Sequence, residues 1–218
     1  MINKLTILKK LSMILLTGSQ GLLGSYLKLE ADRPSHKEFN INNYVHLGQY
    51  KQNEYDLIVH CAAFTDVQGA ETNKSSCFEV NVMGTLNLLE AFPNTPFVLI
   101  SSEYAQNPVN FYSLTKRMAE QLVERHSSYL IIRTLFKATP WPFEKAFEDQ
   151  YTMGGYVSDV APKIDEAIMK WDRKGSKLIY VGDGQGRKTM YQLARKTKPN
   201  VIKNSIKEMK VPIQADYL

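Results

Sequence analysis

The chain has 218 residues, of which 44% are hydrophobic and 22% are charged, a balance typical of a soluble globular protein with one domain. No apolar run approaches the roughly 20 residues that a membrane helix needs, so we predict no membrane association. Two cysteines are too few for a disulfide framework or a metal site, so we predict no metal and a reducing, cytoplasmic environment.

The N-terminal segment is apolar, but Lys9 and Lys10 interrupt it and no small-residue cleavage site follows. We therefore interpret residues 1–12 as a short extension and not as a signal peptide, with Met13 as an alternative start. Residues 13–218 are predicted to form a single domain, in which the part from about residue 135 contributes a separate lobe.

Positive charge is concentrated at the C-terminal end. The net charge is +5, and residues 185–218 contain eight lysines and arginines but only two acidic residues. Nucleic-acid binding is one interpretation of a basic stretch, yet no interleaving of aromatic and basic residues supports it. We expect a solvated surface and no nucleic-acid partner, with Arg187 as the best candidate for contact with an anionic substrate.

The first predicted strand, residues 13–17, runs into the sequence Thr17-Gly18-Ser19-Gln20-Gly21-Leu22-Leu23-Gly24. A buried strand, a glycine turn and a helix start together make a dinucleotide phosphate site. Gly18 would allow the tight turn, Gly21 would let the backbone approach a diphosphate, and Gly24 would let a helix over residues 22–30 pack closely. The N–H groups and the dipole of that helix would hold the phosphates.

Residues 31–37 are polar and contain a proline, which predicts a loop. In dinucleotide folds this region contacts the adenosine ribose, where an acidic residue selects a free 2′-hydroxyl and an arginine accommodates a 2′-phosphate. The sequence offers both Asp32 and Arg33. We favour NADPH, with Arg33 as its contact, and keep NADH as the alternative.

Further strands and helices then alternate along the chain. Residues 57–63 and 97–100 are apolar runs typical of a parallel sheet that is covered on both faces. Between them, residues 77–91 have apolar residues at helical spacing; Asn81 within this helix is either a surface residue or a buried amide that fixes a neighbouring loop. The strand that begins at residue 97 ends at Ser102, and ligands bind beyond such strand ends in doubly wound sheets.

The rest of the chain continues the alternation. A helix is expected from Tyr112 to about Arg125, a strand over 129–133, a helix ending at 166–171, a strand over 178–181 and a short helix over 190–195. This order predicts an α/β fold, a Rossmann-like doubly wound domain with a mostly parallel sheet and a small C-terminal substrate-binding lobe.

Tyr112 and Lys116 are four positions apart and would share one face of their helix. The lysine would lower the pKa of the tyrosine, which would then donate a proton while Ser102 holds a substrate carbonyl oxygen. About one Tyr-x-x-x-Lys motif is expected by chance in this composition, so the motif alone predicts nothing. The order of the glycine turn, two strand ends and this motif is that of short-chain dehydrogenases/reductases.

Longer segments resemble one extended branch of that superfamily, the dTDP-4-dehydrorhamnose reductase family, of which this would be a shortened member. They are His60 to Val67, Val80 to Leu88, Ile100 to Tyr104, Asn110 to Lys116, Ile131 to Thr134 and Arg187 to Ala194. The resemblance implies reduction of a nucleotide-linked 4-keto-6-deoxy sugar with NADPH or NADH, and it leaves a homodimer open.

The resemblance also implies roles for individual residues. Tyr112 would be the acid, Lys116 its partner and a cofactor contact, and Ser102 the carbonyl holder. The expected cofactor residues are Gly18, Gln20, Gly21, Leu22, Leu23, Arg33, Asn40, Ile41, Ala62, Ala63, Thr65, Tyr112 and Lys116. The expected substrate residues are Ser102, Glu103, Phe136 and Arg187.

The chain departs from the family pattern in three places. The loop between Ser102 and Tyr112 is short, which affects the exclusion of water from the site. The region between Gly24 and Asn40 is compressed, so the usual second strand of the sheet would be vestigial. Asn40 stands where an acidic residue is usual. Two alternatives follow: a non-catalytic NADP-binding regulatory subunit, of the kind found with methionine adenosyltransferase, and an epimerase/reductase for the same substrates.

Overall fold

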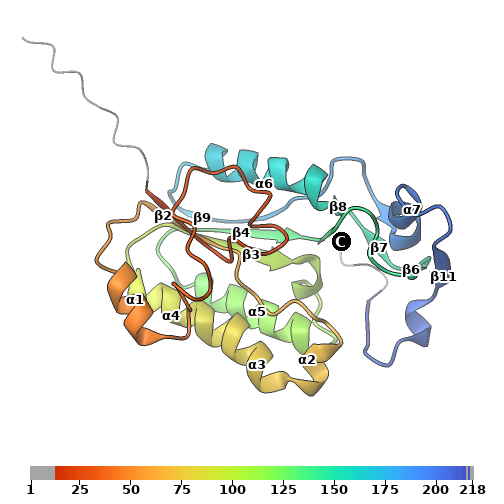
Figure 1. The fold of residues 1–218 in the computed structure, drawn as a ribbon, viewed down its shortest axis with the longest axis horizontal. Helices are drawn as coiled ribbons and strands as arrows, with labels where there is room; N and C mark the ends of the chain where they lie inside the picture. The colour runs from red at the N-terminus through yellow and green to blue at the C-terminus, as the bar shows by residue number, and fades with distance from the viewer. Residues whose placement is uncertain (1–12, 215, 217–218) are drawn as a thin grey trace, which may run out of the picture.

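The computed structural model describes residues 13–214 and 216; the predicted extension, residues 1–12, lies outside the described part. A five-stranded, fully parallel sheet forms the centre, in the order β1-β2-β3-β4-β9 (Figure 1). Its strands are β1 (Ile14–Thr17), β2 (Leu57–His60), β3 (Phe97–Ser102), β4 (Tyr129–Thr134) and β9 (Ser176–Tyr180). The predicted Rossmann-like α/β fold is confirmed.

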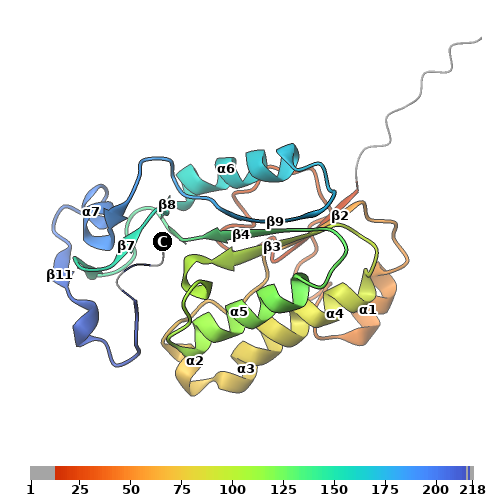
Figure 2. The same cartoon turned by 180° about the vertical axis from the view of Figure 1, so that it is seen from behind.

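Helices cover both faces of the sheet, as the apolar strands require. Helix α6 (Val157–Lys170) lies on one face, and α1 (Tyr44–Tyr50), α3 (Lys74–Phe78), α4 (Gly84–Ala91) and α5 (Phe111–Val123) lie on the other (Figure 2). Every residue of β1, β2 and β3 is buried. Neither face of these strands has contact with water, and continuous apolar runs are the sequence signature of that position.

The helix predicted after the glycine turn is absent, so that prediction is wrong. Residues 20–26 form successive turns, in which Ser25 N–H donates to Gly21 O at 3.0 Å and Leu27 N–H to Leu23 O at 3.2 Å. The chain must then return to β1, because Asp32 pairs beside Leu15 in a single parallel bridge. The compressed segment leaves no length for a helix, and this bridge is all that remains of the vestigial second strand.

Residues 74–91 form one continuous helical segment with an irregular centre. Helices α3 and α4 flank a π-helical turn, η1 (Glu79–Met83), which widens the helix by one residue per turn. The turn brings Asn81 inward, where it is buried. The prediction of helix over 77–91 is therefore confirmed, with an earlier start.

A small lobe packs beyond the carboxyl ends of the strands. It contains short strands, a short helix α7 (Met190–Arg195) and a single helical turn, η3 (Ile206–Glu208) (Figure 1). The strands are β5 (Phe136–Lys137), β6 (Lys145–Phe147), β7 (Tyr151–Thr152), β8 (Gly155–Tyr156), β10 (Lys188–Thr189) and β11 (Ile202–Asn204). Another helical turn, η2 (Glu103–Ala105), directly follows β3 in the sheet domain. The lobe shares a core with the sheet domain, since Tyr104 and Tyr112 pack there with Tyr156 and Leu193.

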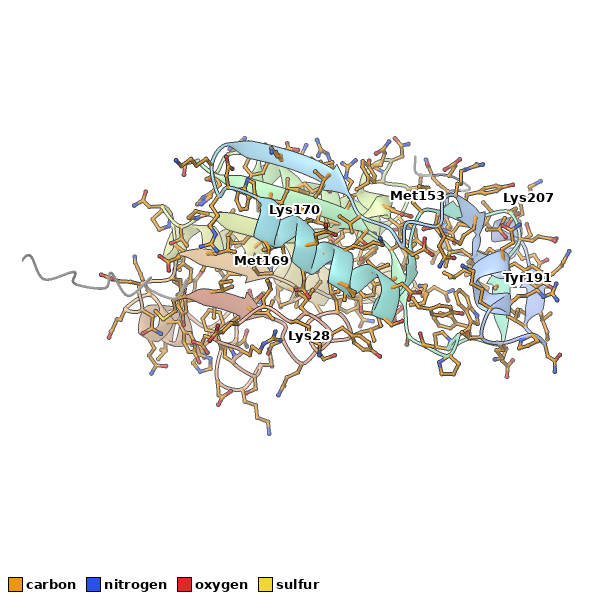
Figure 3. All side chains as sticks on the ribbon, turned by 90° about the horizontal axis from the view of Figure 1, so that it is seen from above. Lys28, Met153, Met169, Lys170, Tyr191 and Lys207 are labelled. Carbon is orange, nitrogen blue, oxygen red and sulfur yellow. The ribbon has the colours of Figure 1, made fainter. Side chains whose placement is uncertain are left out.

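Two further short or exposed features complete the description. Helix α2 (Gly69–Thr72) precedes α3 and was not predicted from the sequence. Met169 and Lys170 at the end of α6 point away from the sheet, and Met169 is 66% exposed (Figure 3). Among the helices of residues 13–214, none is long and apolar enough to cross a bilayer.

The glycine turn leaves no space for side chains, and this gives a first test. A Cβ at Gly24 would lie 2.3 Å from Gly18 O and 2.8 Å from Ser19 Cα, both backbone atoms. We expect Gly24→Ala to lower the free energy of unfolding by about 1–3 kcal/mol, as steric clashes in packed regions do.

Gly48→Ala is the matched control, because a Cβ at this helical glycine would meet nothing within 4 Å. We expect it to raise the free energy of unfolding by up to about 1 kcal/mol, the helix propensity difference. Urea denaturation of the three proteins measures both effects. Equal stability of Gly24→Ala and the wild type would show that the turn is looser than described.

Candidate active site

A cavity of about 730 Å³ lies at the carboxyl ends of the parallel strands. It extends from the glycine turn after β1 to the start of α5 and to the segment after β4. The carboxyl edge of a doubly wound sheet is where ligands bind, because the strands end there and the loops diverge. The cavity therefore has the place that the sequence predicted for the active site.

The glycine turn forms one end of the cavity. Gly18 has φ +68°, and a Cβ there would lie 2.5 Å from Ala62 N, so only glycine fits. Gly21 donates its N–H to Gly18 O at 3.0 Å, whereas the N–H groups of Leu22 and Leu23 have no acceptor in the described part of the chain. Free N–H groups in a turn form an anion-binding concavity even without a long helix.

The adenosine end is built differently from the prediction. Asp32 accepts a 2.6 Å hydrogen bond from the Tyr55 hydroxyl, and the Arg33 guanidinium donates to the carbonyls of Gly24, Leu27 and Leu29 at 2.7–2.9 Å. Neither residue lines the cavity, so the expected contact between Arg33 and the cofactor is not supported. The guanidinium instead satisfies carbonyls that the missing helix leaves without donors. The lining here is Pro34, His36, Phe39, Asn40, Ile41 and Asn42.

The loop after β2 is fixed from behind by Asn81. Its side-chain oxygen accepts from Phe64 N at 2.8 Å, and its amide nitrogen donates to Phe64 O at 3.2 Å and to Thr115 Oγ1 at 3.0 Å. Of the two interpretations of Asn81, the buried amide that fixes a neighbouring loop is confirmed. The loop it holds carries Ala62, Ala63 and Thr65 into the cavity wall.

Burial keeps His60, the last residue of β2, and Cys61, which follows it in the cavity wall, in their neutral forms. His60 is buried between hydroxyls of Thr17 (2.8 Å) and Thr85 (3.2 Å), and burial lowers its pKa to about 3. Burial raises the pKa of the Cys61 thiol to about 12. Both groups are therefore neutral at physiological pH, as expected of packing residues.

The start of α5 is fixed so that Tyr112 enters the cavity wall. Asn110 is the N-cap, accepting from Ser113 N at 2.8 Å, while the Ser113 hydroxyl accepts from Asn110 N at 3.1 Å. Glu71 accepts from Phe111 N at 2.7 Å, which satisfies another free donor of the first turn. Tyr112 lies in this rigid first turn and is buried.

Lys116 lies one turn after Tyr112 and lines the same cavity. Its ammonium donates to Ile100 O at 2.9 Å, at the carboxyl end of β3, and the side chain is only 4% exposed. Burial lowers the pKa of Lys116 to about 8, although the nearby Glu120 carboxylate opposes this shift. The predicted shared face of Tyr112 and Lys116 is confirmed.

The predicted pKa of Tyr112 is wrong in direction. Burial raises it to about 12, and only a contact with the Ser102 side chain lowers it in part. The Lys116 ammonium, which donates to the Ile100 carbonyl, does not offset this effect of burial. The phenol is therefore protonated at neutral pH, which is the state that a proton donor requires.

A buried charge network lies directly behind this pair. Glu120, one further turn along α5, is fully buried and accepts from Arg133 Nε (2.9 Å) and Nη2 (2.8 Å), from Ser101 Oγ (2.6 Å) and from Arg117 (2.9 Å). Burial alone would raise the pKa of Glu120, but these hydrogen bonds outweigh it and hold the pKa below its usual value. The network joins α5 to β3 and β4 and was not predicted from the sequence.

Two expected substrate contacts lie elsewhere. Glu103 is buried, accepts from the Thr152 hydroxyl at 2.7 Å and does not line the cavity, so it joins the sheet to the lobe. Arg187 pairs with Asp216 and stacks 3.8 Å from the centre of the Tyr151 ring, also outside the cavity wall. The expectation that either residue touches the substrate is not supported by their positions.

The remaining predicted residues do line the cavity. They are Gly18, Gln20, Gly21, Leu22, Leu23, Asn40, Ile41, Ala62, Ala63, Thr65, Ser102, Tyr112, Lys116 and Phe136. The sequence reasoning missed His36, Tyr104 and Lys137, which line the cavity as well. Lys137 follows Phe136 directly, just beyond the end of β4, so its place after a parallel strand was the available signal.

Comparison with known proteins adds sequence relatives. A family model described as polysaccharide biosynthesis protein matches residues 37–139. The probable polysaccharide biosynthesis protein EpsC of Bacillus subtilis is 38% identical over 143 residues, which is 61% of this chain and 24% of that protein. A UDP-N-acetylglucosamine 4,6-dehydratase (inverting) of Campylobacter jejuni is 35% identical over 72 residues, 32% of this chain and 22% of the relative.

A dTDP-4-dehydrorhamnose reductase of Mycobacterium tuberculosis is 31% identical over 85 residues, 36% of this chain and 28% of the relative. The chain thus spans about a quarter of the length of the curated relatives that it matches.

Among solved structures, the dTDP-4-dehydrorhamnose reductase of Bacillus anthracis in complex with NADP superimposes with a TM-score of 0.79 at 24% identity, over 93% of this chain and 87% of that one. The chain therefore has the fold of this solved structure, which is the fold that the resemblance implies.

Proposed function

We propose that this chain is an NAD(P)H-dependent reductase of a nucleotide-linked 4-keto-6-deoxy sugar, with Tyr112 as the proton donor. The observation that carries the proposal is the meeting of Ser102, Tyr112 and Lys116 in the wall of one cavity with the glycine turn at its other end. A further support is the sequence similarity to a dTDP-4-dehydrorhamnose reductase.

The residues present suit a dinucleotide. A Cβ at Gly18 would clash with the backbone at Ala62, so glycine keeps the turn tight, and the N–H groups of Leu22 and Leu23 are without acceptors in the described chain. These N–H groups would hold the diphosphate of the cofactor. Asn40 and Ile41 would contact its adenosine, and Ala62 and Ala63 would lie along its side. When bound, the cofactor supplies a hydride.

The chain's own residues supply the proton and the charge. Ser102 would donate a hydrogen bond to the substrate carbonyl oxygen, and the Tyr112 phenol would give its proton to that oxygen as negative charge develops. Lys116, held on the Ile100 carbonyl, would stabilise the tyrosinate that remains. Burial of all three side chains strengthens these interactions, because water cannot screen them.

The short loop after Ser102 leaves water exclusion to other parts of the cavity wall. Phe136, Pro142 and Phe143, from the segment after β4, line the cavity. We propose that these apolar side chains replace part of the missing enclosure.

Features of the same cavity distinguish a reductase from the alternative functions. A purely regulatory NADP-binding subunit does not need a buried serine, tyrosine and lysine placed together. An epimerase or a dehydratase, the latter suggested by the Campylobacter jejuni relative, needs a base to remove a carbon-bound proton. Within the described residues no carboxylate lines the cavity, which favours simple reduction.

Removing one hydroxyl tests the proposed proton donor. We expect Tyr112→Phe to lower kcat by about 10²–10⁴-fold, the usual contribution of a positioned acid, while NADPH still binds. Consumption of NADPH is followed by absorbance with enzymatically prepared dTDP- and UDP-linked 4-keto-6-deoxy sugars, and the product is identified by chromatography.

Tyr104→Phe is the matched control, since the Tyr104 hydroxyl meets Gln150 at 3.0 Å in the same wall. We expect this change to alter kcat less than about tenfold. Wild-type turnover that persists in Tyr112→Phe would refute the role of Tyr112.

The pKa of Lys116 predicts the pH profile. The ammonium must be protonated to stabilise tyrosinate, and its pKa is about 8, so activity is present below pH 8 and is lost above it. We expect kcat/KM at saturating NADPH to be level near pH 7 and to fall about tenfold per pH unit well above 8. A profile that stays level up to pH 10 would contradict a charged Lys116 in the reaction.

The adenosine end predicts weak selection between cofactors. Because Asp32 and Arg33 are both engaged outside the cavity, neither selects for or against a 2′-phosphate. We expect the dissociation constants of NADPH and NADH to differ by less than about tenfold, or 1.4 kcal/mol.

Arg33→Ala should lower the melting temperature, because three carbonyls lose their donor, without changing the ratio of the two constants. Fluorescence titration and thermal unfolding measure the two effects. Specific loss of NADPH binding would show that Arg33 reaches the cofactor after all.

A further inference from the structure

Lys137 is a positively charged side chain that lines the cavity and has no anionic partner among the described residues. It is half-buried, and no carboxylate or hydrogen-bond acceptor contacts its ammonium among the described residues. The ammonium lies over the ring of Phe143, whose centre is 5.4 Å away. The buried Thr134 hydroxyl, three residues earlier in the same wall, also lacks a hydrogen-bond partner.

Such an arrangement is costly in the free protein. An ammonium that loses water without gaining an anion is destabilised, and burial lowers the pKa of Lys137 accordingly. The contact with one aromatic ring returns only a small part of that cost. The other buried cations of the site are compensated: Lys116 by a carbonyl and Arg133 by Glu120. Lys137 is therefore poised for an anion that enters the cavity.

We infer that Lys137 binds a phosphate oxygen of the nucleoside diphosphate carried by the substrate. This inference rests on the proposed function, and it gives Lys137 the role that Arg187 was expected to have. The chemistry alone would allow two sources of phosphate, the substrate and the cofactor.

Sheet geometry favours the substrate. In the strand order β1-β2-β3-β4, the glycine turn follows β1 and Lys137 follows β4, so the two lie three strands apart. Neighbouring strands are about 4.8 Å apart, which separates the two strand ends by roughly 14 Å. A single diphosphate cannot span that distance. If the cofactor diphosphate lies at the glycine turn, the Lys137 ammonium after β4 would bind a second diphosphate, that of the substrate. Ser102, at the end of β3, would then lie between the two diphosphates.

Lys137 also pairs through its strand with the lobe. Strand β5, which contains it, runs parallel to β8, with Lys137 beside Tyr156. The backbone of Lys137 is therefore held by strand β8 of the lobe and not by the segments around the glycine turn. The cation is anchored to the lobe that the sequence predicted to bind substrate.

A set of three variants tests the inference. Lys137→Met removes the charge at similar length, and Lys137→Arg keeps it. Lys170→Met is the control for net charge, because Lys170 is exposed at the end of α6, away from the cavity (Figure 3), and forms a surface ion pair with Glu166. Dissociation constants are measured by calorimetry for NADPH, and for dTDP and UDP with the NADPH-saturated protein. Steady-state kinetics with the keto-sugar substrate follow.

The expected result is specific to the nucleoside diphosphate. Lys137→Met should weaken dTDP or UDP binding about 10–100-fold, as loss of a charged hydrogen bond does. It should raise KM by a similar factor with kcat nearly unchanged, and leave NADPH binding within twofold. Lys137→Arg should remain within about threefold of the wild type, and Lys170→Met should have no effect.

Three results would overturn the inference. The first is a loss of NADPH binding with dTDP and UDP binding intact, which would assign the phosphate to the cofactor. The second is a wild-type protein that binds neither dTDP nor UDP. The third is a loss of kcat that arginine does not rescue, together with loss of deuterium exchange into the sugar, which would make Lys137 a base. A protein that binds both nucleotides without reducing the keto sugar would refute only the proposed function.

Discussion

The buried contact between Glu120 and Arg133 is the constraint on which the site depends. Glu120 is fully buried on α5, and Arg133 lies on β4, so their two hydrogen bonds fix the helix against the sheet. Ser101 on β3 joins the same carboxylate. Removing one member of such a pair leaves an uncompensated buried charge, which typically costs about 3–5 kcal/mol. The rotation of α5, and with it the direction of Tyr112 and Lys116, is set by this pair.

The nucleotide side of the fold is held by backbone contacts instead of by a helix. Gly18 lies against Ala62, and Gly24 against Gly18, at distances that exclude a Cβ. Arg33 then takes over the carbonyls that a longer helix would have satisfied within itself. The chain has thus shortened this half of the fold and compensated with one side chain, while the turn keeps free N–H groups toward the cavity.

The cavity is positively charged because lysines line it and carboxylates do not, within the described residues. The lysines are Lys116 and Lys137. Glu103 directly follows Ser102 and Glu120 lies one turn after Lys116, but both carboxylates accept hydrogen bonds outside the cavity wall. A cavity with unpaired positive charge favours anionic ligands, which agrees with the two diphosphates that the proposed reaction would bring together.

The sequence by itself determined the order of strands and helices, because apolar runs and glycines report local burial and turns. It also determined Ser102, Tyr112 and Lys116, since the carboxyl ends of parallel strands meet at one edge. The tertiary structure decided what depends on distant contacts. The predicted helix after the glycine turn does not form, because the chain returns to β1 at Asp32. The pKa of Tyr112 is raised, because burial outweighs the effect of the neighbouring charge. Arg187 paired outside the cavity, whereas Lys137 lines it, because only the folded chain fixes which cation finds a partner.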